Sequence, residues 1–561
     1  MRSVHSSTSL IVTRMEVPNR TMSDTAAPTT RSLAPTIRLD QAAGWLTCLY
    51  ALILIPILRA DRLYNDDLKR ALFGRTGWDS NGRPLTTLVM KVLQCYDHTL
   101  VDISPFSQLI AGALLVWTGI LVARRFCAAS PFLTALLVFP LGAQPFFLEN
   151  LSYKFDALSM ALALLTALLP FSLTRSGRRS WWWGVLGLFA CLNFYQPALN
   201  AFLIFLLLEA ALGAAELVPV EAIARTLRFR LTQVLLSGLI YELLIGIHVN
   251  GWVKRKGAPI HSVSELPRLG ENLRHFLDYI GSSFNHQWWA YFGPLLFVLG
   301  AASVWVLARY ALRMRDAYPA WLVAALVVSG CFLPFAALVA TFGPLLLLAD
   351  PPIEPRVFIG VGPLLCAALI LFHATLRASL ISSNWALAAG AMVAVGCSVM
   401  ASVYGNAAAQ QKAFEEDIAR TLADDVANVS ARQPLQSLLL EGAAGYSRFT
   451  AHVVEEFPLI QRLIPTYLDA SDQFHPHIFL VAYLGDFEDL RLQNTPAVMA
   501  RNAELLDGIC NEEPLAVRAA YRMYSKDHVG VVLFGPAYEK RCPNWKGASQ
   551  TSNREVSIRR E

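Results

Sequence analysis

Two carboxylates and two cations follow one another closely at Asp66, Asp67, Lys69 and Arg70. A carboxylate can take a proton from a hydroxyl group, and Lys and Arg side chains can hold an anion such as phosphate. The apolar run at residues 43–60 comes directly before this group, so the charges are expected where a membrane meets water. Charged side chains at such a position usually serve a function.

The flanking residues predict a short helix that carries this group. Asn65 can cap the helix, Asp66 and Asp67 would occupy its first turn, and Gly74 can end it in the left-handed conformation. The helix dipole would keep both carboxylates charged. An alternative is that the pair only caps the helix and that Asp66 pairs with Arg70 four residues later. That pairing would leave Asp67 as the preferred base.

Three more polar motifs interrupt the apolar runs, at residues 149–156, 193–197 and 350–356. Together with the first loop they could line a single cavity at one membrane face. Each motif also suits the turn of a helix hairpin, because Pro and Asn are ordinary turn residues. For residues 193–197 the plain turn is the favoured interpretation.

The composition predicts an all-α polytopic membrane protein, since 55% of the residues are hydrophobic and only 16% are charged. The net charge of +5 is small and gives no support to a nucleic-acid partner. A membrane span needs about twenty apolar residues, and about eleven such segments occur. They lie at residues 43–60, 106–124, 131–148, 151–173, 181–195, 198–215, 232–250, 290–312, 319–348, 356–376 and 384–404.

The basic residues alternate between the loops and predict the orientation. Arg124, Arg178, Arg228, Arg313 and Arg377, with their basic neighbours, all fall on one side, which the positive-inside rule assigns to the cytoplasm. We therefore expect a disordered cytoplasmic tail at 1–42, a transmembrane domain at 43–404 and a periplasmic α/β (α+β) domain at 405–561.

The C-terminal region reads as a small domain of mixed structure. Helices are expected at 407–432, 451–463 and 496–506. Strands are expected at 434–441, 478–485, 518–525 and 529–535. Its two cysteines, Cys510 and Cys542, are candidates for a disulfide in an oxidising compartment. His475 and His477 lack further ligands at metal-site spacing and are expected at a strand edge.

Three sequence runs resemble the Gtr type II glucosyl transferase family of bacterial membrane enzymes, which add glucose to O-antigen. They are YNDDLKRALFGRTGWDSNGRPLTTLVM at 64–90, DISPF at 102–106 and PFFLENLSYKFDALSMAL at 145–162. The resemblance extends over about residues 45–405 and is weaker at the PRVFIG run, 355–360, and beyond. It implies a GT-C-type helix bundle in the bacterial inner membrane with a periplasmic active site. It also implies a polyprenyl-phosphate sugar donor and a lipid-linked or growing polysaccharide acceptor.

Transfer from a lipid phosphate needs a base and positive groups for the departing phosphate. Asp66 and Asp67 are the candidates for the base and for orienting the acceptor. The candidates for phosphate binding are Lys69, Arg70, Arg83, Lys154 and Arg356. The candidates for orienting the sugar are Glu149 and Asp156, and Trp78 could stack on it.

Two alternatives stay open. The acidic pair has the oxygen ligands that suit Mg²⁺ or Mn²⁺, although no dedicated metal motif or cofactor site occurs. A transporter or flippase of lipid-linked sugars would also be a polytopic membrane protein. Such a protein is expected to carry ionisable groups inside its spans, where this sequence has few apart from Glu209 and Glu242.

Overall fold

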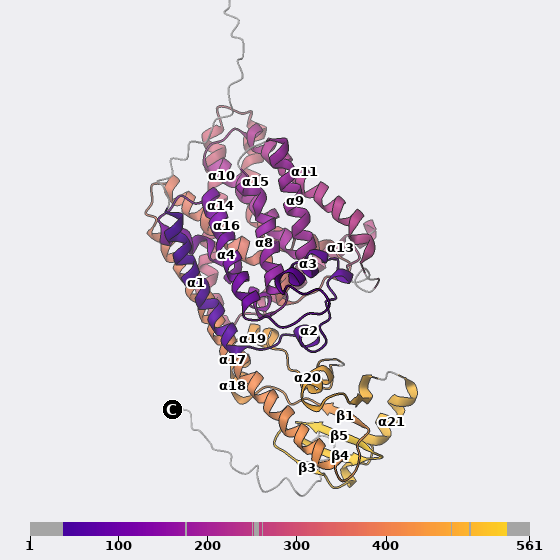
Figure 1. Cartoon of the computed structure of the whole chain (residues 1–561). Coiled ribbons are helices and arrows are strands. Elements are labelled where there is room, and N and C mark those ends of the chain that lie inside the picture. Colours follow the sequence, from indigo (N-terminus) through magenta and orange to yellow (C-terminus); the bar gives the residue numbers. More distant parts are fainter. Residues whose placement is uncertain are drawn as a thin grey trace, which may run out of the picture. The chain divides into compact units, whose positions relative to one another are not determined.

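The computed structural model describes residues 38–173, 177–249, 251, 257–260, 262–472, 474–492 and 495–535. In these residues, long helices form one part of the chain and a small sheet with further helices forms the C-terminal part (Figure 1). Most of the predicted tail at 1–42 lies outside the described residues. The first helix begins at Leu39, a few residues earlier than the sequence indicated.

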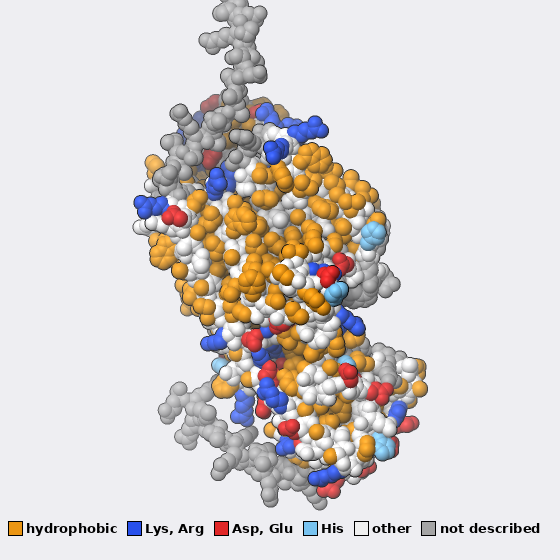
Figure 2. All heavy atoms as spheres, in the orientation of Figure 1, with side chains coloured by type: hydrophobic (Ala, Val, Ile, Leu, Met, Phe, Trp, Pro, Cys, Tyr) orange, Lys and Arg blue, Asp and Glu red, His pale blue; other side chains and the backbone are white. Residues whose placement is uncertain are grey.

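Within the described residues, eight helices are long and apolar enough to cross a membrane. They are α1 (Leu39–Ala60), α4 (Phe106–Phe126), α10 (Leu199–Ala215), α11 (Val220–Leu244), α14 (His286–Met314), α15 (Ala320–Phe342), α16 (Val361–Ala378) and α17 (Asn384–Ser430). Other helices lie between these eight in the chain. They are α3 (Pro84–Leu93), α5 (Pro131–Val138), α6 (Pro140–Ala143), α8 (Ala157–Ser172), α9 (Arg178–Phe194) and α13 (Pro267–Gly281). Apolar side chains cover the visible face of this helical part, and charged side chains gather at its two ends (Figure 2).

All of the segments that the sequence indicated as spans lie mainly in helices, so the helical fold is confirmed, while the count of eleven crossings stays a prediction. Several boundaries were wrong. Helix α11 begins at Val220, well before the predicted start at 232, and residues 131–148 are divided among α5, α6 and the start of another helix. The segment predicted at 151–173 becomes helical only at Ala157, because residues 147–152 form a separate short helix, α7 (Phe147–Ser152), before a turn. That turn carries Lys154 and Asp156.

The basic loop ends lie together at one end of the helices. Arg125 at the end of α4 pairs with Glu209 of α10 at 3.2 Å, and Arg230 of α11 pairs with the same carboxylate at 3.0 Å. Arg377 at the end of α16 donates to the Ala128 carbonyl at 3.1 Å. Glu209, one of the two ionisable exceptions inside a predicted span, is therefore neutralised by two arginines.

A five-stranded sheet with strand order β2-β1-β5-β4-β3 forms the core of the C-terminal part. The strands are β1 (Ser437–Gly442), β2 (Glu488–Asp489), β3 (Ala516–Val517), β4 (Tyr521–Lys526) and β5 (Val529–Phe534). β1 runs parallel to β2 and β5, and β4 is antiparallel to β3 and β5. The helices of this part are α18 (Arg448–Glu456), α19 (Pro458–Leu463), α20 (His475–Leu484) and α21 (Pro496–Leu506).

Two of the C-terminal predictions were wrong in detail. Residues 478–485 form helix α20 rather than a strand, because Pro476 stands in its first turn and Gly485 ends it with a positive φ of 73°. The predicted helix at 451–463 is two helices, since Pro458 has no N–H group to continue α18 and begins α19 instead.

Helix α17 connects the two parts of the chain. It runs without a break across the predicted domain boundary between residues 404 and 405, from the membrane helices into the C-terminal part. Ile418, Ala419 and Leu422 near its far end are buried in one apolar cluster with Leu440 of β1. The C-terminal sheet is therefore built on the extension of a membrane helix.

Candidate active site

The charged group after α1 lies on helix α2 (Asp67–Phe73). Gly74 ends this helix in the left-handed conformation with φ 64°, and its N–H donates to the Arg70 carbonyl at 2.9 Å, as predicted. The predicted cap was wrong by one residue. Asp66 takes the capping position without a side-chain capping bond, and Asn65 precedes it with φ 44°.

Asp67 is completely buried. Its Oδ2 accepts hydrogen bonds from the backbone N–H groups of Lys154 at 2.7 Å and Tyr64 at 3.3 Å. Its Oδ1 has no hydrogen-bond partner in the described part of the chain and lies 3.9 Å from Nη1 of Arg70. Burial raises the pKa of the Asp67 carboxyl to about 8, against the lowering effect of Arg70. The expectation that the helix dipole keeps this group charged was therefore wrong, because desolvation is the larger effect.

Arg70 joins α2 to the loop before α8. Its Nη1 lies 2.8 Å from Oδ2 of Asp156, while its Nη2 is 3.9 Å from the exposed carboxylate of Asp66. Asp156 also accepts a hydrogen bond from Trp78 Nε1 at 2.8 Å, and Arg83 lies 3.6 Å away. The arginine therefore neutralises Asp156 more closely than it does Asp66.

Trp78 is fully buried, and the guanidinium carbon of Arg70 lies 4.5 Å from the centre of its ring. This ring face is occupied by a side chain, so stacking of Trp78 on a sugar has no support in the geometry. The indole instead holds Asp156 through its N–H and holds Arg70 through its ring.

Glu149 and Arg356 form a second charged group. The Arg356 N–H donates to Oε2 of Glu149 at 2.7 Å, and Nη1 of Arg356 lies 3.6 Å from Oε1. The same guanidinium contacts Tyr153 Oη and the Glu354 carboxylate. Burial raises the pKa of the Glu149 carboxyl to about 7, although Arg356 opposes this shift. The Arg356 side chain is 28% exposed, which leaves one side of this cation accessible.

Tyr195 joins the two charged groups. The guanidinium carbon of Arg83 lies 4.8 Å from the centre of its ring, and its hydroxyl donates to the backbone carbonyl of Arg356 at 3.1 Å. Tyr195 belongs to residues 193–197, for which a plain turn was the favoured interpretation. Its motif was visible in the sequence, but its partners come from distant loops.

Lys154 and Lys69 differ in how far their charges are already neutralised. The Lys154 ammonium lies 2.5 Å from Asp61 and 3.3 Å from Asp102, and it is nearly buried. The hollow beside Asp61 and Lys154 has a volume of about 10 Å³, which is room for no more than a water molecule. Lys69 is exposed, with its ammonium 4.9 Å from the centre of the Phe474 ring. The four predicted loops therefore meet, and beside Asp61 and Lys154 there is no room for a substrate.

Other predicted sites have simpler outcomes. Cys542 lies outside the described residues, so the predicted Cys510–Cys542 disulfide stays a prediction. Among the described residues, no three His, Cys, Asp or Glu side chains come close enough to hold a metal ion. His475 starts helix α20 instead of a strand edge, with Nδ1 2.7 Å from Asp472.

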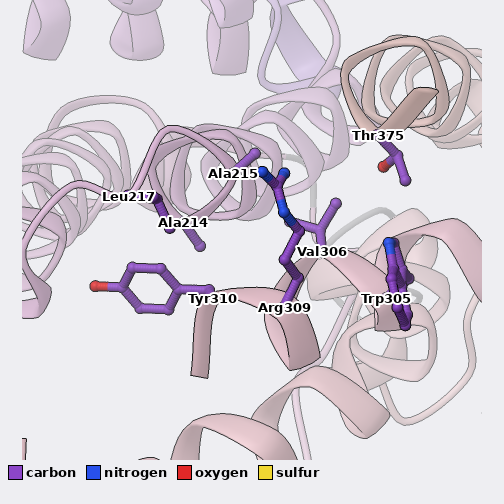
Figure 3. A pocket seen from close by; sticks show the side chains of 8 residues that line it. All are labelled: Ala214, Ala215, Leu217, Trp305, Val306, Arg309, Tyr310 and Thr375. Atoms are coloured by element: carbon purple, nitrogen blue, oxygen red, sulfur yellow. The ribbon is translucent and has the colours of Figure 1, made fainter. Parts of the chain in front are cut away.

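Hollows of different sizes lie among the membrane helices in the described part of the chain. An apolar cavity of about 310 Å³ lies between α13, α14, α15, α16 and α17, with Phe146, Phe284, Trp288 and Leu364 in its lining. Phe146 also stacks on Phe358. In the sequence, Phe146 is close to Glu149 and Phe358 is close to Arg356. The hollow around Trp305, Arg309 and Tyr310 in Figure 3 has a volume of about 0 Å³, so it has no room for a ligand.

The chain is similar to known proteins over much of its length. The model of the family "Glucosyl transferase GtrII" matches residues 55–367, which include all of the charged loops described above. A protein of Salmonella phage P22, described as an uncharacterized 55.3 kDa protein in the gtrB 5′ region, is 23% identical over 428 residues, covering 74% of this chain and 84% of the phage protein. No solved structure matches the chain. The family match covers more than half of the sequence, and the chain therefore belongs to the GtrII glucosyl transferase family.

Proposed function

We propose that this membrane glucosyltransferase moves glucose from a polyprenyl-phosphate donor to a lipid-linked O-antigen or other surface polysaccharide at the periplasmic face. The observation that carries the proposal is that Asp67 and Arg83 of the first polar loop are connected to Arg356 of residues 350–356 through Arg70, Asp156 and Tyr195. Helices that line an apolar cavity lie next to this group. A base, an anion site and an apolar chain site are the parts that such a transfer requires.

Asp67 is the proposed base. Its ionised carboxylate takes the proton of the acceptor hydroxyl, the hydroxyl oxygen bonds to the anomeric carbon, and the bond from that carbon to the phosphate oxygen breaks. The lipid phosphate leaves with the bonding electron pair. Because Asp67 is fully buried and its Oδ1 lacks a hydrogen-bond partner among the described residues, the acceptor must displace a covering group and can then bond to Oδ1. Asp66, exposed beside it, is placed to orient the acceptor.

Arg83 and Arg356 are the proposed phosphate ligands. Their side chains are 20% and 28% exposed, and Tyr195 lies between them as a shared contact. A guanidinium offers paired N–H donors that match phosphate oxygens. Lys69 can add a third, exposed charge. Arg70 and Lys154 are already neutralised by Asp156, Asp61 and Asp102, so we assign them to holding the loops together.

Glu149 is the proposed sugar-orienting residue. It is bound to Arg356, and burial raises the pKa of its carboxyl to about 7, so it can accept or donate a hydrogen bond to a sugar hydroxyl. Asp156, the other candidate for this role, is surrounded by Arg70, Arg83 and Trp78. We therefore assign Asp156 and Trp78 to positioning the two arginines.

The apolar cavity is the proposed place for part of the donor's hydrocarbon chain. It lies among membrane helices and is lined by aromatic and aliphatic side chains, so an apolar chain gains from entering it. Its wall at Phe146 is stacked on Phe358, which stands two residues after Arg356. A lipid with its chain in this cavity could reach Arg356 with its phosphate.

The test is transfer in proteoliposomes with radiolabelled polyprenyl-phosphate glucose and isolated surface polysaccharide. Asp67→Asn should lower the transfer rate by about a hundredfold or more, because the proton acceptor is lost while the shape is kept. Asp66→Asn should lower it less. Asp79→Asn is the matched control, since Asp79 lies in the same loop and only accepts a hydrogen bond from Thr87 at 2.7 Å.

Two results would contradict the proposal. Near-normal rates for Asp66→Asn and Asp67→Asn would remove this loop from the chemistry and leave it as a helix cap. Movement of the labelled lipid across the bilayer without its consumption would identify a flippase instead of a transferase.

A further inference from the structure

The C-terminal part of the chain holds the loop that carries Asp67. The Tyr467 hydroxyl donates to the Leu63 carbonyl at 2.7 Å and accepts from the Asn65 N–H at 2.9 Å. These two backbone groups flank Tyr64, whose own N–H donates to Asp67. One tyrosine hydroxyl therefore holds both sides of the turn that leads into α2.

The ring of Tyr467 is itself held in place. The Arg62 guanidinium carbon lies 4.5 Å from its centre, and Nη2 of Arg62 is 2.7 Å from Oε2 of Glu415 on α17. Oε1 of Glu415 accepts the Tyr467 N–H at 2.7 Å. The Arg62 and Glu415 side chains are 6% and 1% exposed, so this ion pair is shielded from solvent. Breaking one partner of such a pair is costly because it leaves a buried charge alone.

Helix α2 also packs into the apolar core of the C-terminal part. Leu68, the residue after Asp67, is buried in one cluster with Ile418, Leu440 and Tyr467. In Figure 1, α2 lies beside α20, with which it is in contact. Helix α2 therefore contacts the membrane loops through Asp67 and packs against the C-terminal domain through Leu68.

The turn itself has a conformation that needs such support. Asn65 has φ 44°, in the left-handed region that residues with a Cβ atom adopt at a cost. The Asn65 N–H donates a hydrogen bond to the Tyr467 hydroxyl. Without that contact, the turn is free to relax, and the direction of the Asp67 carboxylate changes with it.

We propose that Tyr467 is a positioning residue for the transfer reaction, through which the C-terminal domain sets the place of Asp67. This inference rests on the proposed function, because it assigns Asp67 the role of base. The domain then contributes to the active site by holding the turn at residues 63–65.

The experiment measures kcat and KM in the same proteoliposome assay, with full-length chain and rates normalised to folded protein. Tyr467→Phe keeps the ring over Arg62 and removes both hydroxyl contacts. We expect kcat to fall by about tenfold or more with the donor KM nearly unchanged, because the base is misplaced while the phosphate site is intact. Tyr446→Phe is the matched control, since its hydroxyl donates only to Gln461 and Ile464 of the same domain, and its kcat should stay normal.

A double variant separates positioning from simple stability. In an Asp67→Asn background, Tyr467→Phe should cause little further loss of kcat, because there is no base left to misplace. Additive losses, or a normal kcat for Tyr467→Phe, would overturn the inference. If Asp67→Asn is itself near normal, the proposed function fails instead. Should Tyr467→Phe not reach the membrane, Glu415→Gln, which removes the charge that pairs Arg62, tests the same connection, and a normal kcat there would also overturn it.

Discussion

Asp67 and Asp156 share Arg70, and this sharing sets the electrostatics of the site. The arginine lies 2.8 Å from Asp156 and 3.9 Å from Asp67, so one carboxylate has a close partner and the other has a distant one. Burial then raises the pKa of Asp67 to about 8. A buried carboxyl with a pKa near the working pH is a suitable base, since it can both lose and take up a proton there.

The rate should therefore depend on pH through Asp67. Below pH 8 most Asp67 carries a proton, so kcat/KM should rise about tenfold per pH unit and level off above pH 8. The Glu149→Gln variant should keep this rise of kcat/KM up to pH 8, because it removes only the Glu149 carboxyl, whose pKa is about 7. The measurement is a pH–rate profile of wild type and Glu149→Gln. A flat profile between pH 6 and about 9 would contradict Asp67 as the base.

The stability has the opposite dependence on pH. An unfolded Asp has a pKa of about 3.9, so between pH 4 and about 8 the folded state binds one proton more than the unfolded state. The free energy of unfolding that comes from this group is greatest below the unfolded value and is lost as the pH rises through 8. The pH of greatest stability and the pH of greatest rate are thus separated at this residue.

At the scale of elements, close helix contacts place the charged loops. Helix α1 leads into Asp61 and Arg62, and it crosses α17 where Gly405 meets Pro56. A Cβ atom on Gly405 would lie 2.5 Å from Pro56 Cβ and 2.6 Å from its carbonyl oxygen, so the helices can approach this closely only with glycine there. Arg62, just after the end of α1, and Glu415 on α17 form their ion pair beyond this crossing.

Gly405→Ala should push α1 and α17 apart. Overpacking of this kind costs about 1–3 kcal/mol, so the melting temperature in detergent should fall. Gly300→Ala is the control, because no atom lies within 4 Å of the added Cβ on α14, and alanine favours a helix over glycine. Equal melting temperatures for the two variants would show that the α1–α17 crossing adapts without cost.

At the scale of the whole molecule, charge separates the two ends of the membrane helices. Arg125, Arg230 and Arg377 lie at one end, and the loops with Asp67, Asp156 and Glu149 meet at the other. The positive-inside rule predicts that the first end faces the cytoplasm. The C-terminal sheet, attached to α17 and in contact with α2, belongs to the second end.

Reporter fusions test this orientation. A fusion after Ser180 should report a cytoplasmic position, and a fusion after Arg432, just beyond α17, should report a periplasmic one, because the predicted number of spans before the sheet, eleven, is odd. An enzymatic reporter that is active only in the periplasm gives the readout. Matching signals at the two sites would contradict the predicted crossings between them.

The sequence by itself determined the membrane class, the helix segments and the four polar loops, because apolar length and clustered charge are local properties. It also identified charged residues that come together in the fold, from Asp67 in the first loop to Arg356 in the last. It could not assign their partners. The Arg70–Asp156 pair, the link through Tyr195 and the contact of Tyr467 with Leu63 and Asn65 join residues far apart in the chain.

Only the tertiary structure decided which charges are already neutralised and which are exposed. Burial, which no local pattern encodes, raises the pKa of Asp67, where the helix dipole was expected to keep the group charged, and the Trp78 ring packs against Arg70. It likewise decided that residues 478–485 form a helix, since a short apolar run suits a strand or a helix equally well until its capping residues and packing partners are in place. Local composition sets what each segment can form, and desolvation by distant segments sets what its side chains can do.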